Sequence, residues 1–329
     1  MSRDQITHTQ KRYGVKDAAK EFPMMVVLSF VYVCNAKCPN CPYNNSDIRS
    51  KYRDARFMPE RIFKKIADEC GRYGAYLRIS GGGEPMLHAQ AVELMLYAKT
   101  RGARIGLITN GSKFNKENLT SLLTAGVDVM EFSVDAGDQE TYERVRPGLG
   151  WARLNRNVRL AIQIRKKLKS ETKIIASIIN QEGVDVQDAE GYWSGIVDKV
   201  QVRKYLTWGY NEDKSGDPSP YLPPQERIPC PWLFERLNID SRGDVTLCGE
   251  DIAFDERFAN IMERSIREVW HDPEFVGFRE KHLSGRGDEI PICSKCPDWQ
   301  YRSWQHNYWK ILKDAEKGRK RGGNKNAVG

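Results

Sequence analysis

The chain has 329 residues, long enough for one large domain or a medium domain with a smaller partner, and its 40% hydrophobic content is ordinary for a globular protein. Half of its net charge of +8 lies in residues 313–329, so we expect a solvated basic C-terminus, with nucleic-acid contact as the weaker alternative. The polar N-terminus and the short apolar run at 22–34 argue against a signal peptide or a membrane span, so we predict a cytoplasmic protein.

The run at 22–34 is rich in β-branched residues and predicts a buried first strand. Strands and helices then alternate. We predict strands at 75–80, 103–111, 127–137, 172–180 and 199–205, with helices at 58–73, 88–102, 115–126, 151–170 and 184–196. This alternation is typical of βαβ units and a parallel sheet, and six units favour a partial (β/α)6 barrel over a closed eight-fold one.

The pattern changes after Tyr205, where a proline-rich stretch indicates a boundary or an active-site loop. A β-hairpin follows at 237–248, and then short helices and loops. The domains we expect are an N-terminal extension (1–23), the barrel (24–206), a small cysteine-rich hairpin and helix domain (207–310) and a basic tail (311–329).

Three cysteines, Cys34, Cys38 and Cys41, follow the first strand with the spacing C-x3-C-x2-C. Eight cysteines in a cytosolic chain favour metal binding or catalysis over disulfides. A structural zinc site would need a fourth ligand, for which His88 is the nearest histidine. A cubane iron–sulfur cluster fits better, because three cysteines hold three irons and leave the fourth open to a ligand.

The cysteine motif, followed one βα unit later by "GGGEP", resembles the radical S-adenosylmethionine (AdoMet) enzymes over residues 24–206. The resemblance implies a 4Fe–4S cluster on the three cysteines, with AdoMet chelated to the open iron. It implies that Gly82, Gly83 and Glu84 receive the methionine amino group, and that Ser133 and Asp135 approach the ribose. Relatives usually carry an aromatic residue where this chain has Asn40, so we expect Tyr43 or backbone to contact the adenine.

Four further cysteines lie beyond residue 225: Cys230, Cys248, Cys293 and Cys296. Their arrangement resembles the Twitch domain, the shortened form of the SPASM domain of radical AdoMet enzymes, and implies one auxiliary 4Fe–4S cluster. A zinc ribbon is the alternative from the residues alone. Cys70, on a predicted helix, is expected to be a buried and inert thiol.

A fully ligated second cluster suits a reaction that releases an electron, and the domain arrangement resembles that of an aminocyclitol dehydrogenase. Because only about 23 residues precede the first strand, we expect oxidation of a small sugar or cyclitol alcohol rather than peptide modification. A peptide-modifying enzyme, a redox-neutral epimerase and a zinc-dependent nucleic-acid-binding protein remain alternatives. An external one-electron donor such as flavodoxin or ferredoxin would be the protein partner.

The loop after the last barrel strand carries aromatic and polar side chains that suit a polar substrate. They are Trp208, Tyr210, Asn211, Glu212 and Asp213. No residue stands out as the base for a hydroxyl proton, although Arg203, Lys204 and Tyr205 lie near the expected edge.

Overall fold

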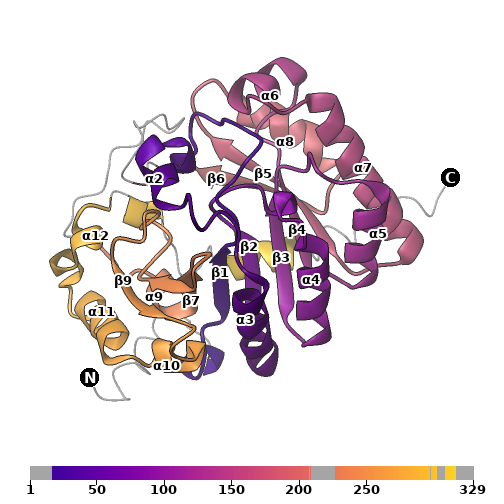
Figure 1. The fold of residues 1–329 in the computed structure, drawn as a ribbon. Coiled ribbons are helices and arrows are strands. Elements are labelled where there is room, and N and C mark those ends of the chain that lie inside the picture. Colours follow the sequence, from indigo (N-terminus) through magenta and orange to yellow (C-terminus); the bar gives the residue numbers. More distant parts are fainter. Residues whose placement is uncertain (1–16, 207, 209–226, 297, 302–307, 316–329) are drawn as a thin grey trace.

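The computed structural model describes residues 17–206, 208, 227–296, 298–301 and 308–315. Six consecutive parallel strands form its main body, with helices on their outer side (Figure 1). The strands are β1 (Met25–Ser29), β2 (Tyr76–Ser80), β3 (Arg104–Thr109), β4 (Val129–Ser133), β5 (Lys173–Asn180) and β6 (Lys199–Lys204). The helices between them are α2 (Ser46–Lys51), α3 (Glu60–Tyr73), α4 (Ala91–Thr100), α5 (Lys116–Thr124), α6 (Gln139–Val145), α7 (Trp151–Leu168) and α8 (Val186–Ser194). This arrangement confirms the predicted partial barrel.

The sheet does not end at β1. Strand β7 (Arg236–Ile239) pairs with β1 in parallel, so that Val26 lies opposite Leu237. Strands β8 (Asp244–Thr246) and β9 (Arg257–Asn260) add on in antiparallel fashion, giving the order β6-β5-β4-β3-β2-β1-β7-β8-β9. The predicted hairpin is therefore present as β7 and β8, but it extends the barrel sheet.

The remaining C-terminal elements pack beside β7 to β9 (Figure 1). They are α9 (Trp232–Glu235), α10 (Ile266–Trp270), α11 (Pro273–Leu283) and α12 (Pro291–Ser294). Helix α10 begins with a capping box, in which Ser265 and Glu268 satisfy each other's backbone N–H groups. Trp270, at the end of α10, donates from its indole to the carbonyl of Ala19, which fixes this helix against the start of the chain.

A helical turn at 308–315 packs on the concave face of the barrel sheet. Its buried residues Tyr308, Leu312 and Ala315 contact the inward side chains of β1, β2, β4 and β5, namely Met25, Tyr76, Val129 and Ile175. Tyr76 needs the room that Gly106 leaves, because a Cβ at Gly106 would lie 2.0 Å from its hydroxyl.

The predicted basic tail begins at residue 311, yet Leu312 and Ala315 are buried. The predicted boundary at 310/311 falls inside this helical turn, whose apolar positions 308, 311, 312 and 315 follow one helix face. Residues 316–329 lie outside the described part of the chain. Among the described residues, no helix combines the length and the apolar character that crossing a bilayer would require.

Candidate functional site

The loop that follows β1 carries the first three cysteines and is tied down by backbone bonds. Cys41 N–H donates to the carbonyl of Cys38 (3.1 Å), and Lys37 N–H donates to that of Pro147 (2.8 Å). Asn44 adds a side-chain bond to the Cys38 carbonyl (2.8 Å). All three cysteines line a cavity of about 660 Å³ at the carboxyl ends of the barrel strands. The glycine run, Asn110, Ser133 and Asp135 line the same cavity, so the motifs that follow the strand ends lie together at one end of the barrel.

Burial makes these thiols hard to ionise without a positive partner. Burial raises the pKa of Cys34 and of Cys38, and it raises that of Cys41 to about 12. The nearby guanidinium of Arg146 opposes the shift at each of them. A bound metal deprotonates a coordinating thiol outright, so this donor set fits an iron–sulfur cluster that supplies the missing positive charge.

Arg146 is a site residue that the sequence analysis missed. It is 9% exposed, and its Nη1 lies 3.9 Å from the sulfur of Cys38. Asp135, at a left-handed φ of 47°, holds it: Oδ2 accepts from Arg146 Nε (2.8 Å) and Nη2 (2.6 Å). The other carboxylate oxygen accepts from the backbone N–H of Ile179 (2.8 Å). Asp135 therefore orients Arg146 at the cysteine loop, and its contact with a ribose remains a prediction.

The glycine run packs directly against the chain that leads into the cysteines. A Cβ on Gly82 would lie 1.9 Å from the carbonyl oxygen of Val31, and one on Gly83 would lie 1.9 Å from that of Val33. Gly82 also has a φ of 74°, which other residues rarely adopt. These glycines are therefore required by backbone packing, whether or not they also contact AdoMet.

Glu84 joins this loop to the end of β3. Its Oε1 accepts from the Thr109 hydroxyl (2.7 Å) and the Met86 N–H (3.1 Å), and Oε2 accepts from the Asn110 N–H (2.7 Å). Burial raises the pKa of Glu84, while these bonds favour its charged form. A carboxylate has about four acceptor positions and these bonds use three, so Glu84 can still accept from the methionine ammonium group of AdoMet, as predicted.

Ser133 and Tyr43 both line the cavity, as Asn40 does. Ser133 is the last residue of β4 and is half-buried. Tyr43 lies against the glycine run, with its hydroxyl in hydrogen-bonding range of the Ser29 side chain and the Gly82 backbone. Burial raises the pKa of Tyr43 to about 12, so the phenol stays neutral. The predicted adenine contact of Tyr43 is compatible with this position and stays a prediction.

Deeper in the barrel, two arginines meet one glutamate. Glu131 on β4 is 1% exposed and accepts from Nε of Arg203 on β6 (3.0 Å), with a second, shorter bond from Arg203 Nη2. Arg78 on β2 approaches the other oxygen of Glu131 at 3.7 Å, and its guanidinium stacks 4.8 Å from the ring centre of Tyr308. Burial alone would raise the pKa of Glu131, but the two arginines hold it below its usual value, so the carboxyl is ionised.

The C-terminal cysteines form the second set, and three of them are electrostatic neighbours. Besides burial, Cys230 raises the pKa of Cys293, and both of these cysteines raise the pKa of Cys296. Burial, with these neighbours, raises the pKa of Cys293 and of Cys296 to about 12. Cys248 follows β8, where its sulfur accepts from the Glu250 N–H (3.3 Å).

His282 on α11 connects two members of this set. Its Nδ1 accepts from the backbone N–H of Cys230 (3.3 Å), so the proton of the neutral ring is on Nε2. Nε2 lies 3.4 Å from the sulfur of Cys293 and donates to it. His282 was not among the residues singled out from the sequence.

The remaining candidate residues from the sequence differ in where the structure places them. His88 donates from Nε2 to the Met58 carbonyl (3.0 Å) and accepts at Nδ1 from Gln90 N–H (3.1 Å), so both ring nitrogens are used and the zinc alternative through His88 is wrong. Cys70 is fully buried in α3, as expected. Arg203, Lys204, Tyr205 and Trp208 line the cavity, whereas Tyr210, Asn211, Glu212 and Asp213 lie outside the described residues.

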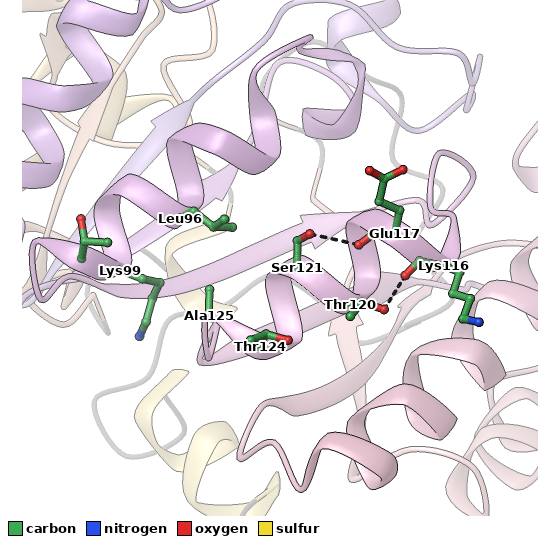
Figure 2. Close-up of a pocket in the computed structure, with 9 residues that line it drawn as sticks. Leu96, Lys99, Lys116, Glu117, Thr120, Ser121, Thr124 and Ala125 are labelled. Carbon is green, nitrogen blue, oxygen red and sulfur yellow. Dashed lines mark hydrogen bonds between the residues drawn. The ribbon is translucent and has the colours of Figure 1, made fainter.

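A second hollow, of about 920 Å³, lies outside the barrel between α4 and α5 (Figure 2). Two of the hydroxyls that line it donate within their own helix: Thr120 donates to the Lys116 carbonyl (2.7 Å) and Ser121 donates to the Glu117 carbonyl (3.1 Å). No cysteine is among the residues that line it. The candidate site is therefore the cavity inside the barrel.

Comparisons with known proteins agree with this location. Residues 28–183 match the model of the radical SAM superfamily, and residues 230–297 match that of the SPASM iron–sulfur cluster-binding domain. The chain is similar to a PqqA peptide cyclase of Xanthomonas oryzae pv. oryzae, with 24% identity over 314 residues, 84% of this chain and 82% of that protein.

Two solved structures share the fold. SuiB of Streptococcus suis, bound to its precursor peptide SuiA, matches with a TM-score of 0.63, 15% identity, and coverage of 84% of this chain and 70% of that one. The structure of anSMEcpe with AdoMet and the Kp18Cys peptide matches with a TM-score of 0.60, 15% identity, and coverage of 91% and 99%.

These findings correct one expectation and support another. The predicted oxidation of a sugar or cyclitol is wrong, because these relatives are named for peptides or were solved with them. The number of residues before the first strand did not predict the class of substrate. The matched domains imply three cofactors: AdoMet, a 4Fe–4S cluster that binds it, and an auxiliary iron–sulfur cluster. That the two cysteine sets are the ligands of these clusters remains a prediction.

Proposed function

We propose that this chain, a radical SAM enzyme with a C-terminal SPASM domain, modifies a peptide or protein substrate. The observation that carries the proposal is the similarity to a PqqA peptide cyclase, which extends through both domains over 84% of the chain. The cavity of about 660 Å³ at the carboxyl ends of the strands is within the size range of cofactor and ligand sites.

Within this proposal, Cys34, Cys38 and Cys41 hold the first cluster, and Gly82 to Glu84 receive the methionine part of AdoMet. With the cluster on these cysteines and AdoMet against Gly82 to Glu84, the site would supply radical chemistry that takes a hydrogen atom from the substrate. The chain orients the reactants: Arg146 is held beside Cys38 by Asp135, and Glu84 fixes the glycine loop to β3.

Cys230, Cys248, Cys293 and Cys296 hold the auxiliary cluster in a domain of the shortened, Twitch-like type. Four thiolates saturate a cubane and leave no iron for the substrate, so we assign it to electron transfer. An external one-electron reductant such as flavodoxin or ferredoxin supplies the electron that starts the reaction.

The test uses the anaerobically reconstituted protein with AdoMet, a chemical reductant and two classes of substrate. One class is a set of synthetic peptides encoded by short reading frames near the gene, and the other is a set of sugars and cyclitols. We expect a peptide to promote formation of 5′-deoxyadenosine and to lose hydrogen, as seen by mass spectrometry. A variant with Cys34, Cys38 and Cys41 changed to Ala is the control. Cleavage promoted by sugars and by no peptide would overturn the proposal.

A further inference from the structure

One group of three charged side chains inside the barrel carries more positive than negative charge. Arg78 and Arg203 flank Glu131, and an arginine stays protonated in proteins, so this group of three carries a net charge of +1. Arg203 has further support, because its Nε also donates to the Ser177 hydroxyl (2.8 Å). The surplus therefore belongs mainly to Arg78.

The hydrogen bonds of Arg78 are incomplete. Its Nη2 is 3.7 Å from Glu131, beyond a normal hydrogen bond, and its Nε has no hydrogen-bond partner in the part of the chain that the structure describes. The Tyr308 ring covers the guanidinium but offers no carboxylate. A largely buried guanidinium in this state lowers its free energy when an anion pairs with it.

The other buried carboxylates of the cavity are engaged elsewhere. Glu84 accepts from Thr109 and two backbone N–H groups, and Asp135 is paired with Arg146. Glu235 lies 3.8 Å from Arg236. None of these described carboxylates is paired with Arg78, so the charge is available to a ligand.

A ligand in the cavity can reach both arginines. Both line it, and their side chains are 13% and 30% exposed. Arg78 projects from the middle of β2, below the glycine run that follows this strand, and Arg203 projects from the second-last residue of β6. An anion bound there would lie beneath the AdoMet site.

We propose that Arg78 and Arg203 form a subsite for a carboxylate of the substrate, so that the enzyme selects a peptide with an acidic group at the modified region. This inference rests on the proposed function and adds the chemical class of the residue that enters the barrel. The carboxylate comes from an aspartate or glutamate side chain or from the peptide C-terminus.

The test uses three pools of random octapeptides built only from uncharged residues and acetylated at the N-terminus. One pool has Glu at a central position and an amidated C-terminus, and the second has Gln there with the same ends. The third has Gln and a free C-terminal carboxylate. Immobilised, cluster-loaded protein with AdoMet is incubated with each pool, and retained peptide is measured by mass spectrometry.

We expect the wild-type protein to retain about tenfold more peptide from the Glu pool or the free-carboxylate pool than from the neutral pool. One charge-assisted contact contributes a difference in affinity of this size. Whichever pool is preferred identifies the source of the carboxylate. Arg78→Met should abolish the preference, because Glu131 keeps Arg203 and the remaining pair is neutral. Arg78→Lys should keep part of it, and iron content and circular dichroism check folding in both.

The matched control is Arg104→Met. Arg104 stacks on Tyr76 (5.6 Å) much as Arg78 stacks on Tyr308, but it is exposed and does not line the cavity, so this variant should keep the preference. Equal retention of all three pools by the wild type would overturn the subsite while leaving peptide modification intact. Loss of AdoMet affinity in Arg78→Met would also overturn it, by assigning Arg78 to the AdoMet carboxylate. Retention of no pool would count against both proposals.

Discussion

Replacing Asp135 by Asn tests whether this residue serves the protein or the ribose. Asp135 is 1% exposed and pairs through one oxygen with two nitrogens of Arg146, itself 9% exposed. The change leaves a buried guanidinium without its carboxylate, and breaking a buried pair in this way costs about 3–5 kcal/mol. We therefore expect a large fall in the free energy of unfolding, together with a displaced Arg146 beside Cys38.

The barrel offers a matched control at its other end. Asp198 is 4% exposed at its side chain, pairs with Arg165, and accepts from the backbone N–H of Ile174 (2.7 Å), as Asp135 does from Ile179. Asp198→Asn should cost a similar free energy of unfolding. Only Asp135→Asn should also change the spectrum of the first cluster.

The assay is urea denaturation of wild type and both variants under identical anaerobic conditions, followed by circular dichroism, with electron paramagnetic resonance of the reduced first cluster. Binding of AdoMet is measured separately by calorimetry. If Asp135→Asn lowered AdoMet affinity while changing the unfolding free energy by less than about 1 kcal/mol, Asp135 would be a ribose ligand and the structural reasoning would be refuted.

Three further changes have definite expected outcomes. Gly83→Ala places a methyl group 1.9 Å from the Val33 carbonyl, so the first cluster should be lost or its iron content should fall sharply; full iron loading would contradict the packing argument. Burial and the nearby Asp244 raise the pKa of Asp240 to about 6, so its folded form binds a proton more readily than the unfolded chain. The free energy of unfolding should thus fall by up to about 3 kcal/mol as pH rises from about 4 to 6. In Asp240→Asn the urea midpoint should depend less on pH over this range. His282→Phe removes the N–H donated to Cys293, the proposed ligand of the auxiliary cluster, and should lower the reduction potential of that cluster in a redox titration. His282→Gln should lower this potential less, and an unchanged potential in the Phe variant would contradict the proposed role of this hydrogen bond.

The sequence by itself determined the elements and the chemistry of the first site. The alternation of strands and helices follows from local patterns. Helix α3 shows this well, because Ile62, Phe63, Ile66 and Ala67 recur at helical spacing within the predicted helix 58–73 and are all buried. The close spacing of Cys34, Cys38 and Cys41 likewise predicts ligands for one cluster, since ligands a few residues apart remain near each other in any fold.

Only the tertiary structure decided what lies far apart in sequence and close in space. The pairing of β7 with β1, the helical turn at 308–315 inside the barrel and the approach of Arg146 to Cys38 all join distant segments. The meeting of Arg78, Glu131 and Arg203 depends on the register of three separate strands. Local patterns record the period of a helix or a strand, whereas these contacts arise from how the sheet curves and which residues its strands bring to the same level.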